Sequence, residues 1–374
     1  MDDSRYVTTD DEIRSRIPDD VYERLADQLN ALPNGFPRTR SGVEIRLLRK
    51  IVSPEEAWLA GYLGREMESP QKIGSRVGLP ADEVTEKMRR LSRRGLVSST
   101  DQDGVRQYRL VPFVVGLYEY QLTAMDHELA HLFEQYLMCE GVAQEIFGTH
   151  PPLHRVIPAR KAVKSELILP YDDARALLLQ ARSFGVQDCI CRTEQTLAGH
   201  RKCNFPLKNC LFFNKTERNF RSAAISREEA LAILDEAEQI GLVHTGINNA
   251  VNNSVLENEY ICNCCGCCCG FLRAINEWGI ETSIAKANYY AEIDPDKCMG
   301  CEICVERCQV GAIAMRGVTA AVDLSRCIGC GLCVTGCPDE AAHLHRKPDA
   351  ELIHPPDDFA TWEIERLRSR GMVE

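Results

Sequence analysis

Two short runs of cysteine near the C-terminus have the spacing with which proteins hold iron–sulfur clusters. The first run is Cys298-x2-Cys301-x2-Cys304-x3-Cys308, and the second is Cys327-x2-Cys330-x2-Cys333-x3-Cys337. Three thiolates on one tight loop can bind three irons of a [4Fe-4S] cubane, and the fourth ligand then comes from elsewhere. Zinc sites and disulfides do not fit the doubled spacing. The two runs therefore predict two [4Fe-4S] clusters.

The stretch that contains both runs, residues 290–347, resembles a bacterial two-[4Fe-4S] ferredoxin domain. In that arrangement the last cysteine of each run crosses to the other cluster. The resemblance implies one cluster held by Cys298, Cys301, Cys304 and Cys337, and a second held by Cys327, Cys330, Cys333 and Cys308. Gln309 follows Cys308 where a proline is usual, whereas Pro338 follows Cys337 as expected. Because that proline shapes a turn and is not a ligand, the predicted ligand sets are unchanged.

Ten further cysteines between residues 189 and 269 form a second group of candidate metal ligands, namely Cys189, Cys191, Cys203, Cys210, Cys262, Cys264, Cys265, Cys267, Cys268 and Cys269. The first four lie among basic residues, which favour the thiolate that metals need. Adjacent cysteines of a strand point in opposite directions. The last six therefore cannot share one centre without an irregular loop, which Gly266 and Gly270 permit.

We expect at least one additional iron–sulfur cluster at these middle cysteines, since four thiolates suffice for one. A structural zinc ion is the alternative, because spacing alone does not exclude it, and unligated or redox-exchanging thiols are a third interpretation. The segment 261–269, Ile-Cys-Asn-Cys-Cys-Gly-Cys-Cys-Cys, resembles uncharacterised iron–sulfur proteins of anaerobic bacteria that join such a segment to a ferredoxin domain. That resemblance names no activity.

Composition places this chemistry in a reducing compartment. The chain has 374 residues, 19 cysteines and a net charge of −11. It shows neither an export signal nor an apolar run long enough to cross a membrane. Cysteine-rich chains of this kind are typical of metal ligation rather than of disulfides. We expect a cytoplasmic protein from an anaerobic or low-oxygen host.

The N-terminal third resembles a winged-helix domain. Ser53-Pro54-Glu55-Glu56 is a capping box with proline at the first helical position, which predicts a helix through about Arg65. Helices over 71–77 and 80–94 follow, and then two short strands flank an Asp103-Gly104 turn. The elements before it, residues 1–40, are predicted to be an N-terminal arm with a short helix over 21–32.

A winged helix could bind DNA or dock a protein. The third predicted helix carries Arg89, Arg90, Arg93 and Arg94, which are the candidate phosphate contacts. Residues 40–110 hold 14 Lys/Arg against 10 Asp/Glu, which is a weak positive charge for a DNA-binding domain. We therefore favour docking or spacing over DNA binding.

The remaining elements complete a multidomain α+β protein. A long helix is expected over 117–136, where His127-Glu-x-x-His131 matches a zinc-protease motif that we reject as a chance match. Residues 137–160 are expected to be a connection. Helices over 171–184 and 226–240, each followed by glycine and a short strand, predict a compact α/β domain. A tail helix is expected over 359–369.

The predicted domains are a winged-helix-like domain at 41–115, a connecting helix and linker at 116–157, a cysteine-rich α/β domain at 158–287, a two-[4Fe-4S] ferredoxin domain at 288–348 and a tail at 349–374. The arm at 1–40 precedes them.

Three functions fit these features. No phosphate-binding loop, dinucleotide fingerprint or nucleophile elbow is present. We favour an electron-transfer protein that relays single electrons to or from a partner oxidoreductase. The alternatives are a redox-sensing winged-helix transcription regulator and an iron–sulfur reductase with its substrate at the middle cluster. The chain could thus be an oxidoreductase or a subunit of one, and the partner and substrate are left open.

Overall fold

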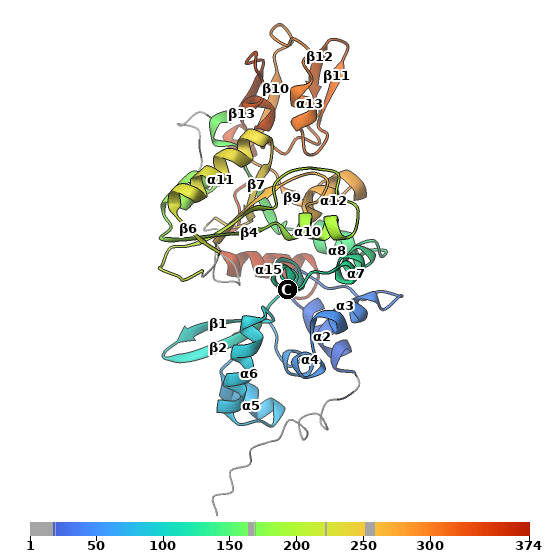
Figure 1. Cartoon of the computed structure of the whole chain (residues 1–374), viewed down its shortest axis with the longest axis vertical. Helices are drawn as coiled ribbons and strands as arrows, with labels where there is room; N and C mark the ends of the chain where they lie inside the picture. The colour runs from blue at the N-terminus through green and yellow to red at the C-terminus, as the bar shows by residue number, and fades with distance from the viewer. Residues whose placement is uncertain (1–17, 19, 164–167, 169, 221–222, 251–258) are drawn as a thin grey trace, which may run out of the picture. The chain divides into compact units, whose positions relative to one another are not determined.

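The computed structural model describes the chain except residues 1–17, 19, 164–167, 169, 221–222 and 251–258 (Figure 1). Residues 1–17 and 19 of the predicted N-terminal arm therefore lie outside the described residues. The chain divides into two compact units, Met1–Val142 and Ala143–Glu374. No helix in the described part is both long and apolar enough to cross a membrane.

The first unit contains the helices and the hairpin expected from the sequence and one further helix, α3, that the sequence analysis did not predict. Its helices are α2 (Val21–Asn30), α3 (Val43–Ile51), α4 (Pro54–Ala60), α5 (Pro70–Val77) and α6 (Ala81–Arg93), followed by strands β1 (Val97–Gln102) and β2 (Val105–Leu110). The Ser53 capping box forms as predicted, although α4 ends at Ala60, before the expected end of that helix. At the hairpin turn Asp103 and Gly104 both have positive φ, 51° and 78°. Asp-Gly suits such a two-residue turn because these residues tolerate that conformation. Apart from α3, the elements follow in the expected order, and the winged-helix assignment stays a prediction.

The predicted long helix over 117–136 is wrong in its first half. Short irregular turns occupy Phe113–Leu117 and Glu119–Gln121, and α7 begins only at His127 and ends at Leu137. Val114 and Val115 have extended backbones, and Asp126 caps α7 by accepting a hydrogen bond from the Leu129 amide at 2.8 Å. A local cap therefore overrides the apolar periodicity. The His127 and His131 rings stack 4.1 Å apart, and no third ligand joins them among the described residues.

The second unit is built on a seven-stranded sheet of order β6-β4-β5-β8-β7-β3-β9. Its strands are β3 (His154–Ile157), β4 (Ser183–Asp188), β5 (Lys208–Asn214), β6 (Ala224–Ile225), β7 (Val243–Ile247), β8 (Glu259–Cys264) and β9 (Ile284–Ala285). All neighbours are antiparallel except β3 and β9. The α11 helix (Arg227–Ile240) lies along the sheet (Figure 1) and packs with α9 (Ala174–Leu179) on a core that includes Phe184, Phe213 and Leu234.

Two predictions about this unit need correction. The helix expected over 171–184 is only α9, and Ser183 and Phe184 already belong to β4. The stretch expected to be a connection holds α8 (Val142–Gly148) and β3, and all four β3 residues are buried. A strand this short is defined by its hydrogen-bonded neighbours β7 and β9, which no local sequence pattern reveals. The other predicted helix is confirmed as α11, with its Ser226 capping box.

The seven-stranded sheet leads into two small antiparallel two-stranded sheets, of which only the second is a hairpin. Strand β10 (Tyr289–Ile293) pairs with β13 (Ala342–Arg346), and β11 (Ile313–Arg316) pairs with β12 (Thr319–Val322). Two short helices, α13 (Ile303–Arg307) and α14 (Leu332–Thr335), contact each other between them. The apolar core of this part includes Ala291, Ile313 and Ala320 and is shared with cysteines of both runs.

The tail helix α15 (Phe359–Ser369) forms as predicted and is anchored by a buried arginine. Arg366 is fully buried and donates to the backbone oxygens of Ile146 at 2.6 Å, Thr149 at 2.5 Å and Pro151 at 2.7 Å. Trp362 adds a bond from Nε1 to the Pro152 oxygen at 3.0 Å. The helix is thus tied to the segment between α8 and β3, directly before the sheet begins.

We expect Arg366→Met to destabilise the protein by roughly 3 kcal/mol, because buried carbonyl oxygens lose their donor. The midpoint of urea unfolding, measured anaerobically on the full chain, reports this change. Arg368→Met is the matched control, since Arg368 lies on the exposed side of the same helix, and it should leave the midpoint unchanged. Equal midpoints for the two variants would contradict the anchoring role of Arg366.

Candidate iron–sulfur and thiolate metal sites

The first ferredoxin-type site is a small cavity lined by sulfur ligands from both cysteine runs. Cys298, Cys301 and Cys304 of the first run line it together with Cys337, the last cysteine of the second run. This is the set that a crossed fourth ligand requires. Cys301 is exposed, so this site lies near the protein surface.

The second ferredoxin-type site gathers the complementary set. Cys308 lies close enough to Cys330 and Cys333 to raise the pKa of each thiol, although burial is the larger cause at both. The pKa of Cys330 rises to about 12. Because metal ligation needs the thiolate, iron must displace protons from this site when a cluster is built.

Backbone amides point at several of these sulfurs. Ala312 donates to Cys308 Sγ at 3.1 Å, Ala320 to Cys298 Sγ at 3.5 Å and Ala341 to Cys337 Sγ at 3.2 Å. Hydrogen bonds to cluster sulfurs are among the factors that set a cluster's reduction potential. The loops approach the sheet so closely that a Cβ on Gly329, whose φ is 73°, would lie 2.4 Å from the Tyr289 oxygen. The fold therefore requires glycine inside the second run.

The middle cysteines form two groups in space, and each group combines cysteines from residues 189–210 with cysteines from residues 262–269. Six of them form a closed ring in which each thiol interacts with the next, in the order Cys189, Cys191, Cys269, Cys264, Cys262, Cys210 and back to Cys189. We call this set the six-thiol ring. Hydrogen bonds to Cys210 and Cys264, together with burial, raise the pKa of Cys262 well above its usual value.

The secondary structure explains how six distant residues meet. Cys262 and Cys264 are alternate residues of β8 and therefore face the same side of the sheet. Cys210 lies on the neighbouring β5, which pairs with β8. Cys189 and Cys191 stand at the start of α10 (Ile190–Leu197), and Cys269 is the residue before α12 (Gly270–Trp278). Two helix N-termini and two strands thus supply the ring.

The other four middle cysteines form a second, more compact group. Cys203, Cys265, Cys267 and Cys268 have all four sulfurs within 4.8 Å of one another. We call this set the four-thiol group. Cys203 comes from the loop between α10 and β5, and the other three come from the loop between β8 and α12. The loop needed at Gly266 forms, and it divides the six cysteines of segment 262–269 equally between the two groups.

A buried arginine lies between the six-thiol ring and the four-thiol group. Arg192 has no exposed surface, and its guanidinium donates to the Asn209 side-chain oxygen and the Asn263 backbone oxygen, each at 2.7 Å. Burial alone would lower its pKa, but attraction to Cys189 and Cys265 more than offsets this and the pKa is raised. A buried cation is favourable only beside compensating negative charge, which thiolates would supply.

Gln309, the residue that replaces the usual proline, links the ferredoxin-type part to the middle cysteines. Its side chain accepts from the Gly266 amide at 2.8 Å and donates to the Gly241 oxygen at 2.9 Å. Its backbone oxygen accepts from Asn276 Nδ2 at 2.9 Å. The preceding Arg307 donates to backbone oxygens of Glu238 and Gln239 at the end of α11. The sequence shows the unusual residue, a glutamine in place of proline, but it does not show that this side chain contacts the loop of the middle cysteines.

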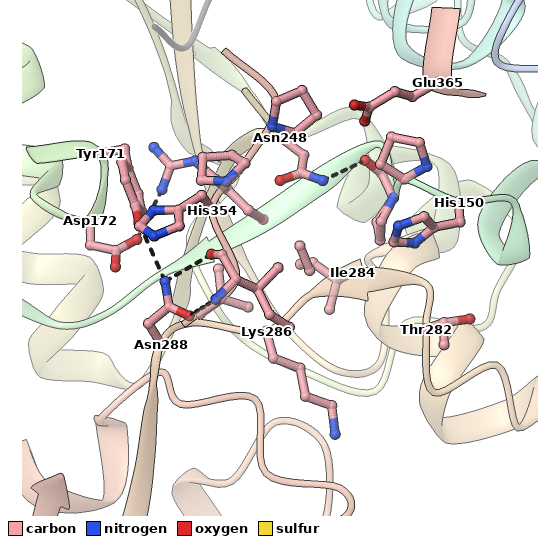
Figure 2. Close-up of a pocket in the computed structure, with 18 of the residues that line it drawn as sticks. His150, Tyr171, Asp172, Asn248, Thr282, Ile284, Lys286, Asn288, His354 and Glu365 are labelled. Atoms are coloured by element: carbon pink, nitrogen blue, oxygen red, sulfur yellow. Dashed lines mark hydrogen bonds and ion pairs between the residues drawn. The ribbon is translucent and has the colours of Figure 1, made fainter. Parts of the chain in front are cut away.

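A separate cavity of about 500 Å³ lies between β3, β9 and the tail (Figure 2). Arg155 lines it, is 3% exposed, and pairs through Nη1 with Asp172 at 3.2 Å, while its Nε and Nη2 have no hydrogen-bond partner among the described residues. Burial raises the pKa of Asp172 to about 6. Figure 2 shows Asn288 hydrogen-bonded to the backbone of Ile353, which closes one side. Sequence reasoning did not find this cavity.

The cavity borders the second ferredoxin-type site. Lys347 lines the cavity, and Cys327 lies near enough to influence its pKa, which burial lowers overall. A volume of this size is ordinary for a small-molecule site.

The arginines of α6 are only partly available for a ligand. Arg89, Arg90 and Arg93 have exposed side chains that lie within 3.8 to 4.0 Å of Glu86. Arg94 pairs with Glu56 at 3.0 Å and donates to the Ile51 oxygen at 2.6 Å. Structural contacts within this unit thus account for Arg94.

Comparison with known proteins agrees with the ferredoxin-type geometry. Residues 290–338 match the family described as a 4Fe-4S dicluster domain. No curated protein matches the chain. The chain thus contains an iron–sulfur cluster-binding domain and, before it, a cysteine-rich region with the geometry of a metal site.

We expect Cys308→Ser to damage the cluster held by Cys327, Cys330 and Cys333, because Cys308 is their crossed fourth ligand. Cys337→Ser should damage the other cluster. Electron paramagnetic resonance of the reduced protein, with iron counts, distinguishes the two spectra. Damage by Cys308→Ser confined to the cluster of its own run would show that the ligands do not cross.

We expect Gln309→Ala to lower the free energy of unfolding by roughly 1–3 kcal/mol, because two side-chain hydrogen bonds are lost. Gln309→Pro restores the usual residue of this motif and should be equally destabilising, since proline cannot replace the amide. Gln239→Ala, an exposed glutamine on α11, is the control. A Gln309→Pro protein as stable as the wild type in urea would show that the Gln309 hydrogen bonds do not contribute to the free energy of unfolding.

Proposed function

We propose that this protein relays single electrons through two ferredoxin-type [4Fe-4S] clusters and a further iron–sulfur centre, to or from a partner oxidoreductase. The single observation that carries the proposal is the Gln309 link. It joins a residue adjacent to the ligand Cys308 to the loop that holds middle cysteines. The turn after Cys308 and the loop that holds middle cysteines are therefore in direct contact.

The six-thiol ring is the proposed place of the further iron–sulfur centre. Its members do not gather tightly enough for a single metal ion, and the same is true of the ferredoxin-type ligands, within the range of residues that the structure describes. A cluster spreads its ligands because each thiolate binds a different iron. Six thiolates are more than the four that one [4Fe-4S] cluster needs, so the ring has ligands enough for such a cluster or a larger one.

The exposed first cluster is the proposed point of exchange with the partner. Cys301 is exposed, and Met299 beside it is 76% exposed. An exposed apolar side chain next to a cluster can form part of a surface on which a redox partner docks. Electrons would then pass from the first cluster to the second and on to the ring, which lies in the part of the chain that the Gln309 contact holds against the ferredoxin-type part.

A second candidate function is an iron–sulfur reductase, and the Arg155 cavity favours it. Nε and Nη2 of Arg155, which have no hydrogen-bond partner in the described part of the chain, could bind a planar oxygen-bearing group, for which arginine is well suited. The cavity lies beside the second ferredoxin-type site rather than beside the middle cysteines. The substrate would thus meet electrons at a different place from the one expected from the sequence.

The transcription regulator is the weakest of the three functions. Arg94, just after α6, is held by Glu56, whereas Arg89, Arg90 and Arg93 share the one carboxylate of Glu86, so these contacts leave only a modest uncompensated positive charge, about two, on α6. Binding of duplex DNA needs such charge to displace counterions. We propose that the winged-helix-like part docks a protein or spaces the domains.

The proposal predicts about twelve or more irons per chain after anaerobic purification, because two cubanes account for about eight. Cys262→Ser removes one thiol of the six-thiol ring and should reduce the count to about eight, whereas Cys139→Ser, outside all four cysteine sites, should not. A wild-type count of about eight would exclude an iron–sulfur centre in the ring.

The same sample distinguishes the two candidate functions. An electron carrier reduced with dithionite should reoxidise rapidly with a protein acceptor and show no multiple turnover with small organic oxidants. Sustained turnover of a small oxidant, lost in Arg155→Gln with the iron retained, would favour the reductase.

A further inference from the structure

We propose that the four-thiol group, Cys203, Cys265, Cys267 and Cys268, binds one zinc-class divalent ion in a tetrathiolate site. This site is separate from both ferredoxin-type clusters and from the six-thiol ring. The inference does not rest on the proposed electron-transfer function, because it concerns a different set of ligands.

The distances between the sulfurs are those of a tetrahedron around one ion. Cys203 Sγ lies 3.8 Å from Cys265 Sγ and 3.9 Å from Cys268 Sγ. Cys267 Sγ lies 3.9 Å from Cys265 Sγ and 3.6 Å from Cys268 Sγ. Four sulfurs placed about 2.3 Å from a central zinc ion are about 3.8 Å apart. Four of the six edges of the group therefore already have the required length.

The ferredoxin-type cysteines provide an internal comparison. They belong to a domain that matches a cluster-binding family, yet no three of them have their sulfurs within 4.8 Å of one another in the described chain. The four-thiol group is the one set of described residues that meets this condition. The same fold thus arranges cluster ligands and the four-thiol group in two different ways, and the second suits a single ion.

The ligand set and its surroundings are those of a structural site. Four thiolates complete the coordination of zinc and leave no open position for a substrate. Cys265 and Cys268 are 1% and 2% exposed and pack against the apolar side chains of Leu242 and Ala237. Zinc has no redox chemistry of its own, so the ion would hold structure and would not carry electrons.

The surrounding residues hold both ligand loops in place. Arg201 donates from Nε to the Cys203 oxygen at 2.9 Å and fixes the loop that carries this ligand. Asn276 donates to the Gly266 oxygen at 3.1 Å, and a Cβ at Gly266 would lie 2.0 Å from the Gln309 oxygen. Such outer contacts orient metal ligands and are part of a metal site.

Charge favours a divalent ion at this position. Four thiolates around a divalent cation carry a net charge of about −2, which is costly to bury without a counter-charge. The buried Arg192 guanidinium lies beside Cys265 and supplies part of it.

The ion would tie together the two loops that also carry ring cysteines. Cys203 precedes Cys210 in the chain, while Cys265 directly follows Cys264 and Cys268 directly precedes Cys269. Fixing the four-thiol group therefore fixes the entry and exit of three ring ligands. The bound ion would therefore help to hold the ring cysteines in position.

The test is metal analysis of the full chain, purified anaerobically from cells supplied with both iron and zinc. We expect one zinc per chain in the wild type and in Cys139→Ser. Cys203→Ser and Cys267→Ser should lose most of it while the ferredoxin-type clusters keep their spectra. Cys262→Ser, which opens the ring, should lose iron but keep zinc.

Two outcomes would overturn the proposal. One is a wild-type protein without zinc, and the other is a fall of about four irons in Cys203→Ser, which would make the four-thiol group an iron–sulfur site. If the variants fail to fold, X-ray absorption at the zinc edge of the wild type decides instead. Four sulfur neighbours at about 2.3 Å support the site, and any nitrogen or oxygen neighbour contradicts it. If the chain contains zinc but the six-thiol ring contains no iron, only the electron-transfer proposal is contradicted.

Discussion

The contact between Gln309 and the loop at Gly266 is the constraint on which the arrangement of the second unit depends. Gly266 cannot carry a side chain because the Gln309 oxygen occupies that space, and the Gly266 amide has Gln309 Oε1 as its partner. The same glutamine binds the Gly241 oxygen at the end of α11. One side chain therefore sets the position of a cysteine loop, a helix end and the turn after Cys308. A ferredoxin-type domain with proline here could exist alone, but it could not make this contact.

Arginines hold other parts of the unit together in a similar way, and two of the three, Arg192 and Arg366, are fully buried. Arg192, Arg307 and Arg366 each donate to backbone oxygens from segments far apart in the chain. A guanidinium suits this task because its planar donors can satisfy several carbonyl groups at once. Its charge also has a consequence at Arg192, where the neighbours are thiols. There the arginine both joins β5 to β8 and stabilises thiolates.

The sheet decides how the middle cysteines are shared. Alternation along β8 turns Cys262 and Cys264 to one side, and the loop after the strand carries Cys265, Cys267 and Cys268 away from it. The chain then re-enters a helix at Cys269, which returns to the side of the ring. A segment that looks like a single cysteine-rich motif thus supplies thiols to two sites that differ in the distances between their sulfur atoms. The spacing of the sulfur atoms at each site indicates which kind of metal centre fits it.

Local sequence determined those parts of this protein whose signals lie within a few residues. The two cluster-binding runs, the Ser53 and Ser226 capping boxes, the Asp103-Gly104 turn and the tail helix could all be predicted, because ligand spacing, caps and turns are short-range chemistry. The ligand crossing followed from resemblance, and the cavities and charges of the structure are in keeping with it.

Only the tertiary structure decided which distant residues meet. The prediction of one helix over 117–136 failed because the cap at Asp126, which starts the helix later, outweighed the apolar periodicity. Strand β3 was missed because its partners β7 and β9 lie far along the chain. The grouping of Cys203 with Cys265, Cys267 and Cys268, rather than with Cys189, Cys191 and Cys210, depends on the order of strands in the sheet. Sequence states how many thiols are present and how they are spaced. Which thiols surround one centre is a matter of distances across the fold, and these are set by hydrogen bonds such as those of Gln309.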